Sequence, residues 1–278
     1  MHRLALRHPI SRCGVQPTRL SHHMSTFQLD RDIFNPTLYK QVTNIWLAGA
    51  DVDGKRLDDT IVKKWFSGDA ELDRICNDNF AHVLDTIGPE RLPEPSAKPF
   101  LHELEAMHKE DKGDGGSQAA WTALSMVILL DQMPRNIFRT NEGLKKVYTH
   151  YDRMAFDLVK SLFSASSPIS RPDLHPQWQN SFAHKMWFYL PLTHSEDVKA
   201  HDILDDLVEP VSKSVEKLEG YEATKRLIEG FRTSEKSHRE PLELFGRYPH
   251  RNSALSRTNT EQEQEFLKDG GATFGVAQ

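Results

Sequence analysis

The chain has 278 residues, a formal net charge of −5 at pH 7 and a hydrophobic fraction of 38%, which suffices for one sizeable buried core. The acidic excess gives no basic field for nucleic acid or an anionic membrane, and argues against both partners. Its two cysteines, Cys13 and Cys76, lie far apart without nearby ligand spacing, which argues against a disulfide framework or structural zinc and favours a reducing compartment. The longest apolar run, 126–130, is too short to span a bilayer, so we expect a soluble protein.

The N-terminal stretch has a composition of its own. Before Asp30 there is no acidic residue, while four arginines alternate with Ser and His, as in a mitochondrial transit peptide. Met24 offers a second interpretation, because a start there would leave an ordinary cytosolic N-terminus. Both remain open, so the expected location is mitochondrial or cytoplasmic, and residues 1–28 are predicted to be an extension outside the fold.

From residue 29 onward, apolar residues recur at helical spacing, and no stretch shows the sustained period-two alternation of a strand. The sequence therefore predicts an all-α fold, an irregular helical array forming a single domain over 29–278. Pro, Gly and Ser mark loop insertions near 88–117 and 164–177. The expected helices cover about 36–46, 58–66, 72–83, 100–108, 118–132, 142–163, 178–189 and 260–267.

The most apolar of these helices ends in a carboxylate. At 100° per residue, Asp131 and Gln132 fall on the same stripe as Trp121 and Ile128. An isolated buried charge costs several kcal/mol, so Asp131 must be paired. Arg135 and Arg139 are close in sequence and can supply the partner. An ion pair between Asp131 and one of these arginines would either fix a turn between helices or form part of a functional site.

The segment after Pro191 carries a second polar group. A helix beginning near Thr193 would give Thr193 and Glu196 capping-box spacing, which is a structural role for Glu196. On the same helix His194, Asp197 and His201 would share one face and could hold a divalent metal. Polar residues on a solvated helical face are far commoner, so no metal site is predicted.

A third polar group lies at a bend near the C-terminus. Gly246 and Pro249 impose a turn that would hold four hydrogen-bonding side chains together, which suits recognition of an anion. Alternatively, the arginines there serve as internal counter-ions for Asp131, Glu196 and Asp197. The four side chains are Arg247, His250, Arg251 and Asn252. Thr260 and Glu263 then show capping-box spacing for a final helix.

The motifs LLDQMPRNIFR, FYLPLTHSED and FGRYPHRNSALSRTNTEQEQEFL resemble the signature blocks of the family called domain of unknown function 924, and the similarity covers about residues 38–270. The resemblance implies an all-α fold like the tetratricopeptide-repeat superfamily, found in bacteria and fungi, without an established activity. The chain departs from the family pattern at Ser256 and His201. The family's polar signature falls on Asp131, Gln132, Arg135, Asn136, Arg139, His194, Glu196, Asp197, His238, Arg247, His250, Arg251 and Asn252.

No 34-residue period is apparent, so these motifs suggest one polar cleft more than a regular peptide-binding solenoid. The leading hypothesis is a small-molecule enzyme, most simply a hydrolase, that acts on or binds an anionic compound without a cofactor or metal. The alternative is a tetratricopeptide-like scaffold for a protein partner, in which the polar motifs form a structural network. The catalytic candidates are His194, Glu196, Asp197 and His250. The candidates for substrate binding are Asp131, Arg135, Asn136, Arg139, Arg247, Arg251 and Asn252.

Overall fold

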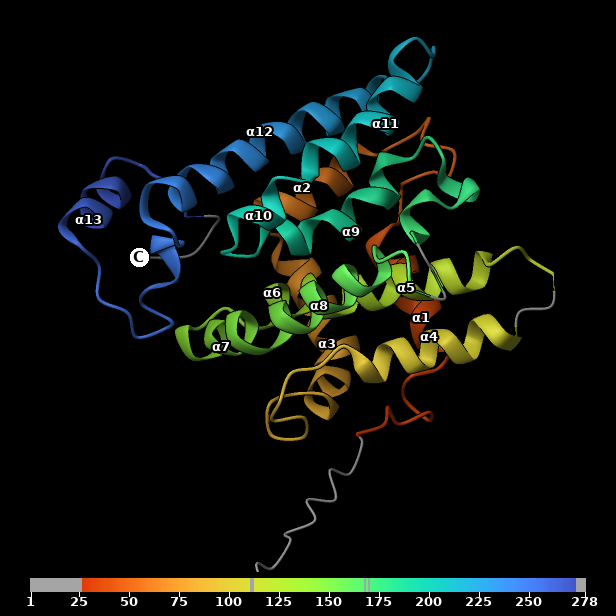
Figure 1. Ribbon diagram of the computed structural model, residues 1–278, viewed down its shortest axis with the longest axis horizontal. Helices are drawn as coiled ribbons and strands as arrows, with labels where there is room; N and C mark the ends of the chain where they lie inside the picture. Colours follow the sequence, from red (N-terminus) through yellow and green to blue (C-terminus); the bar gives the residue numbers. More distant parts are fainter. Residues whose placement is uncertain (1–26, 111–112, 168, 170, 274–278) are drawn as a thin grey trace, which may run out of the picture.

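Helices alone build the part of the chain that the computed structural model describes, which comprises residues 27–110, 113–167, 169 and 171–273 (Figure 1). Within these ranges there is no strand, only an isolated bridge between Ala50 and Leu57. The predicted all-α, single-domain fold is thus confirmed. None of the helices described is long and apolar enough to cross a membrane. The predicted N-terminal extension lies, except for its last two residues, outside the described residues.

The helices are joined by connections of very different length, and the longest lies between α8 and α9. The first half contains α1 (Pro36–Trp46), α2 (Asp59–Ser67), α3 (Ala70–Thr86), α4 (Lys98–Glu110), α5 (Ser117–Asp131) and α6 (Met133–Ile137). The second half contains α7 (Asn141–Lys146), a π-helical turn (Val147–Tyr151), α8 (Asp152–Leu162), α9 (Phe182–Thr193), α10 (Val198–His201), α11 (Leu204–Glu216), α12 (Glu222–Phe245) and α13 (Glu261–Lys268). Short 3-10 turns cover Pro172–Leu174, Pro176–Trp178 and Pro249–Arg251.

Helix α5 runs through the middle of the core. From Ala119 to Asp131 every residue except Trp121 is buried. A helix that is apolar on all sides must be covered on all sides, and α1, α4, α8 and α9 pack around it (Figure 1). The apolar stripe predicted for this segment is therefore part of a wholly buried helix.

Helix α9 is also buried along its whole length and lies parallel to α5. Near the N-terminal ends of the two helices, the rings of Trp121 and His184 are 5.5 Å apart between centroids. Near the C-terminal ends, the Asp131 carboxylate lies 2.8 Å from the His194 ring. The helix pair thus brings together two distinct sets of side chains, one at each end.

The prediction that a helix begins near Thr193 is wrong. Helix α9 continues through Thr193, whose hydroxyl donates to the carbonyl of Leu190, and the next helix begins only after Asp197, whose carboxylate accepts from the Lys199 amide. The predicted capping box of Thr193 and Glu196 therefore does not form. Buried packing of the whole FYLPLT stretch extends α9 beyond Pro191, against the local breaking signal.

The capping box expected at the last helix is confirmed: the Thr260 hydroxyl accepts from the Glu263 amide, and the Glu263 carboxylate accepts from the Thr260 amide. Three helices were not expected: the five-residue α6, then α11 and the 24-residue α12. Each of the last two contains an internal proline, Pro210 and Pro241 respectively, which removes a backbone hydrogen bond and masks the helical signal.

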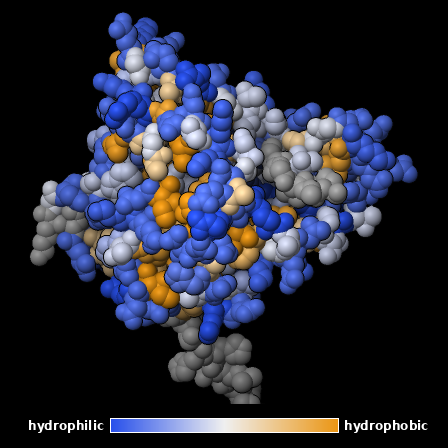
Figure 2. All heavy atoms as spheres, turned by 180° about the vertical axis from the view of Figure 1, so that it is seen from behind, coloured by the Kyte–Doolittle hydropathy of each residue, from blue (hydrophilic) through white to orange (hydrophobic). Residues whose placement is uncertain are grey.

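Apolar side chains reach the surface in places. Seen from behind, they gather in the middle of a largely hydrophilic face (Figure 2). Phe66 on α2 is 56% exposed and stacks on the buried Trp187 of α9, with centroids 6.2 Å apart. The other large exposed hydrophobic residues are Val52, Leu174, Ile203, Leu218 and Leu244.

Candidate functional site

A carboxylate and an imidazole meet where α5 and α9 end. Asp131, the last residue of α5, is 1% exposed, and its Oδ1 lies 2.8 Å from Nδ1 of His194, directly after α9. The second carboxylate oxygen accepts from Nε2 of Gln132 at 2.5 Å. Because a carboxylate only accepts, Nδ1 of His194 carries a proton and Nε2 keeps its lone pair. The His194 side chain is 14% exposed, and no described residue forms a hydrogen bond with its Nε2.

Arg135 follows one helical turn later and closes the end of α5. Its Nη1 donates at 2.7 Å both to the Asp131 carbonyl and to Oδ1 of Asp152, the first residue of α8. The last carbonyls of a helix have no partner within it, so this donor satisfies one of them. The Arg135 side chain is 20% exposed. Within the described ranges, its Nε and Nη2 groups have no acceptor, so the guanidinium retains donors at the edge of the site.

Arg251 closes the end of α9 in the same manner. Its Nη2 donates to the His194 carbonyl at 2.8 Å and lies 3.6 Å from Oδ2 of Asp152. The guanidinium is held between the rings of Tyr148 and Tyr248, at 4.4 and 4.6 Å from their centroids. Such stacking is a favourable cation–π arrangement. Arg251 is therefore enclosed inside the protein, with its Nε buried and not hydrogen-bonded to any described residue, whereas the Arg135 side chain is 20% exposed.

The protonation states follow from these contacts. Burial would raise the pKa of the Asp131 carboxyl, but the positive charges and donors around it, above all His194 and Arg135, lower that pKa overall. Burial, and then the charge of Arg135, lower the pKa of His194, with Asp131 opposing them. At neutral pH the pair is a carboxylate beside a neutral imidazole. Two arginines then balance Asp131 and Asp152, and the cluster has no net charge.

Two further histidines lie behind this pair. The ring of His238 is 6.1 Å from that of His194, and its Nδ1 donates to the Ser234 carbonyl at 2.8 Å. Burial is the main cause that lowers the pKa of His238 to about 3 and that of His250 to about 2. His250, expected as an acid or base, is therefore neutral across the physiological range and forms an aromatic layer with Tyr248.

Several expected site residues are instead paired in separate clamps. Both oxygens of Glu196 accept from Arg257 at 2.9 Å, and Oε1 also accepts from the Tyr248 amide at 3.0 Å. Asp197 caps α10. The carboxylate that orients the His194 ring is thus Asp131, and neither Glu196 nor Asp197 makes a hydrogen bond to that ring within the described residues.

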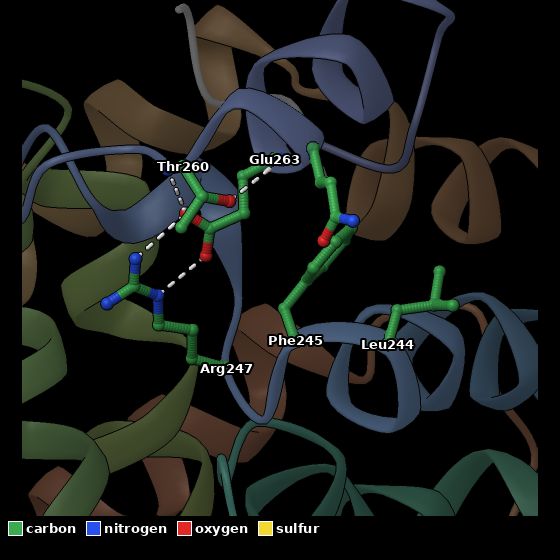
Figure 3. Close-up of a pocket in the computed structure, with 6 residues that line it drawn as sticks. Leu244, Phe245, Arg247, Thr260 and Glu263 are labelled. Carbon is green, nitrogen blue, oxygen red and sulfur yellow. Dashed lines mark hydrogen bonds and ion pairs between the residues drawn. The ribbon is translucent and has the colours of Figure 1, made fainter.

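Arg247 points away from the cluster, toward the last helix. It donates to both oxygens of Glu263, at 2.6 and 2.8 Å (Figure 3). It also donates to the Thr258 carbonyl at 3.1 Å. Asn252 donates to the side chain of Asn259 at 2.7 Å. The bend at 245–252 therefore divides its polar residues: Arg251 reaches the cluster, while Arg247 and Asn252 anchor the C-terminal segment.

The remaining candidate residues lie outside the cluster of Asp131 and His194. Arg139 forms an exposed ion pair with Asp73 at 2.6 Å, and Asn136 donates to the Gln132 carbonyl at 3.0 Å. His201 binds Glu235 at 2.8 Å, so it does not join His194 and Asp197 on one helical face. Among the residues described, no group of three His, Cys, Asp or Glu side chains is placed to hold a metal ion.

Sequence reasoning missed Asp152 and Tyr148. Both belong to the continuous helical stretch 141–162, at the π-helical turn and directly after it. Such turns occur often at functional sites because they displace side chains from regular helical positions. Asp152 is 8% exposed, and its position on the same helical face as the apolar Ala155 and Val159 was the one signal available in the sequence. Nothing in the local sequence indicated that it would contact Arg135.

The comparisons with known proteins agree with this architecture. A solved structure of a protein of unknown function from Agrobacterium tumefaciens shares 25% identity with the chain, with a TM-score of 0.53, and the match covers 84% of this chain and 98% of that one. No curated protein matches the chain. The family model described as bacterial protein of unknown function, DUF924, matches residues 42–271. The expected resemblance is thereby confirmed, and the chain belongs to the DUF924 family.

Proposed function

We propose that the joined C-terminal ends of α5 and α9 form a small-molecule site in which His194 transfers a proton and Arg135 binds an anionic group. One observation carries the proposal: Asp131 holds Nδ1 of a neutral His194 at 2.8 Å and leaves Nε2 available. An imidazole oriented by a carboxylate is the common arrangement for general acid and base catalysis. The reaction class that needs the fewest additional groups is hydrolysis.

In this mechanism, Nε2 of His194 accepts a proton from a water molecule while the water oxygen attacks the substrate. The Asp131 carboxylate stabilises the imidazolium that forms, and the proton then passes from Nε2 to the leaving group. Asp131 and Arg135 keep their positions throughout, because both are fixed by bonds to the helix ends. No covalent intermediate is required.

The anionic group of the substrate would bind by hydrogen bonds more than by net charge. The charges of Arg135 and Arg251 are already balanced by Asp131 and Asp152. The unengaged Nε and Nη2 donors of Arg135 point to a carboxylate or phosphate, whose oxygens match the planar guanidinium. Tyr148, which is partly exposed beside Arg251, lies at the same edge.

The test uses the full-length protein against a panel of carboxylate and phosphate esters. We expect His194→Gln to lower turnover about 100-fold or more, as loss of a general base does, and to cost about 1 kcal/mol or less of unfolding free energy. The matched control is His102→Gln, because His102 is exposed on α4, and it should change neither quantity. Equal turnover in wild type and His194→Gln would contradict the proposal.

A second candidate function is a tetratricopeptide-like scaffold for a protein partner. It is favoured by the complete pairing of Glu196 with Arg257 and of Glu263 with Arg247, which are structural contacts. Under this alternative, His194→Gln would lower the unfolding free energy by about 2–4 kcal/mol as a network residue, and no ester in the panel would be hydrolysed. Stability and turnover together therefore separate the two functions.

A further inference from the structure

A cavity of about 510 Å³ lies at the opposite end of the pair of α5 and α9, where α1 crosses them. This volume is within the range of small-molecule sites, about 300–1,000 Å³. Its wall combines apolar side chains with polar ones from three helices. The polar ones are Tyr39, Lys40, Thr43 and Asn44 of α1, Gln118 and Ser125 of α5, and His184 of α9.

His184 provides a fixed hydrogen-bond acceptor in this cavity. Its side chain is nearly inaccessible, and its Nδ1 lies 2.7 Å from the Ser181 hydroxyl, which itself donates to the Asp51 carbonyl at 3.2 Å. The arrangement that satisfies both contacts has the single hydroxyl proton of Ser181 donated to Asp51 and the Nδ1 proton of His184 donated to Ser181, so that Nε2 keeps the lone pair. In the described part of the chain, no group donates to this Nε2.

The surroundings keep the His184 ring neutral and immobile. It stacks on Trp178, with an interplanar angle of 14°, and meets Trp121 edge-on at 5.5 Å. Burial lowers the pKa of His184 to about 4. An acceptor of this kind, enclosed by aromatic rings, matches a ligand that carries an O–H or N–H donor on a flat apolar body.

Lys40 supplies the opposite feature at the mouth of the cavity. It is exposed on α1 and forms no ion pair with any described residue, although the chain as a whole is acidic. The apolar part of the lining includes Trp121, Leu47 and Val52, and the remaining polar side chains of the wall are uncharged. Along the chain the lining residues follow the order Lys40, Asn44, Leu47, and the next segment reaches Asp51, whose carbonyl accepts from Ser181, the partner of His184. A ligand that spans the cavity in this direction meets a cation at one end, apolar and uncharged polar side chains in the middle and an acceptor at the other end.

From this order of groups, we propose that the cavity binds a small aromatic carboxylic acid with a hydroxyl or ring N–H group opposite its carboxylate. The carboxylate pairs with Lys40, the ring packs against Trp121, and the donor bonds to Nε2 of His184. The site shares no residue with the cluster of Asp131 and His194, so its ligand is independent of the function proposed above.

Three related probes test the inference on the full-length protein by calorimetry: 4-hydroxyphenylacetate, its carboxamide, and phenylacetate. We expect the first to bind about fivefold or more tightly than either analogue, since one lacks the charge and the other the donor. Lys40→Gln should abolish the preference for the acid over the amide, whereas the exposed control Lys145→Gln should retain it. His184→Phe should abolish the preference for the hydroxyl and keep the aromatic packing.

Other outcomes overturn the inference. They are the absence of saturable binding below about 10 mM, equal affinity for all three probes, or preferences that survive in both cavity variants. If His184→Phe does not fold, the nitrogen chemical shift of Nε2 in the wild type decides instead: it must change when 4-hydroxyphenylacetate is added and stay constant with phenylacetate. His194→Gln should bind the probe as the wild type does, which separates this site from the other.

Discussion

The two ends of the pair of α5 and α9 hold a histidine in the same manner for different chemistry. At the C-terminal end, Nδ1 of His194 is held by the Asp131 carboxylate, among two arginines and a second carboxylate. At the N-terminal end, Nδ1 of His184 is held by the Ser181 hydroxyl among tryptophans. A carboxylate stabilises an imidazolium, while a hydroxyl does so only weakly. The first end is thus suited to proton transfer and the second to recognition.

Helix polarity explains why the charges gather at one end. The last carbonyls of α5 and α9 lack partners within their helices and carry the negative end of each dipole. Arg135 and Arg251 donate to the carbonyls of Asp131 and His194, respectively. These arginines are buried or nearly so, and they need counter-ions of their own, which Asp131 and Asp152 supply. The ionic cluster thus arises from two parallel helices ending at one place.

The largest effect is expected for Asp131→Ala. It leaves His194 and Gln132 without their acceptor and Arg135 without the counter-charge 3.7 Å away, and removing one member of a buried ionic group costs about 3–5 kcal/mol. Urea unfolding measures the loss. The control is Asp73→Ala, which breaks the exposed pair with Arg139 and should cost less than about 1 kcal/mol. Equal losses in the two variants would mean that the C-terminal end is not a buried ionic cluster.

The pH dependence of stability should be the next largest effect, and it involves both ends. Folding lowers the pKa of His184 to about 4, of His238 to about 3 and of His250 to about 2. Below about pH 6.5 the unfolded chain therefore binds more protons than the folded one, and the free energy of unfolding decreases as the pH is lowered.

Each histidine contributes up to about 1.4 kcal/mol per pH unit in that window, so we expect the three together to lose about 3 kcal/mol between pH 6.5 and 5.5. Urea titrations at several pH values measure it. The stability of His184→Phe should fall less steeply, because one of the three groups is gone. A flat profile over this window would contradict the assigned neutral histidines.

A smaller loss is expected for Arg251→Met. The thioether can fill part of the space between Tyr148 and Tyr248, but the variant loses the cation–π contacts and the bond to the His194 carbonyl, for about 2 kcal/mol. Thermal unfolding monitors the change. Arg232→Met, at a surface pair with Glu209 and Glu229, is the matched control and should change stability by about 0.5 kcal/mol. A loss no larger than that of the control would show that Arg251 does not close α9.

The smallest loss of stability is expected at the N-terminal end of the pair of α5 and α9, where His184 lies. Ser181→Ala removes the hydroxyl that bonds His184 and the Asp51 carbonyl, which should cost about 1 kcal/mol. The Nδ1 proton of His184 then loses its acceptor, and nitrogen NMR should report a mixture of the two neutral tautomers. Ser161→Ala, whose hydroxyl bonds the carbonyl one turn earlier at the surface, should be nearly neutral. A single unchanged tautomer in Ser181→Ala would contradict the role assigned to Ser181.

Local patterns predicted most of the helices and part of the cluster. Asp131 on an apolar stripe had to be buried and paired, and both expectations are confirmed. The pairing with Arg135 was accessible because the two residues are one helical turn apart. Helices α11 and α12 were not predicted because each contains an internal proline, which is a helix-breaking signal in the sequence. Arg247 was expected beside Arg251, yet a turn directs it to Glu263, and motif proximity cannot reveal on which side of a bend a side chain lies.

The sequence by itself determined the all-helical fold, the family and the need of Asp131 for partners, because helical periodicity and the cost of a buried charge act over a few residues. Only the tertiary structure decided which partners these are. The contact with His194 and the cavity beside His184 depend on α5 and α9 lying parallel, and the counter-charge of Asp152 depends on α8 beginning beside α6. That arrangement is set by packing of the whole core, which joins residues more than 60 positions apart in the chain.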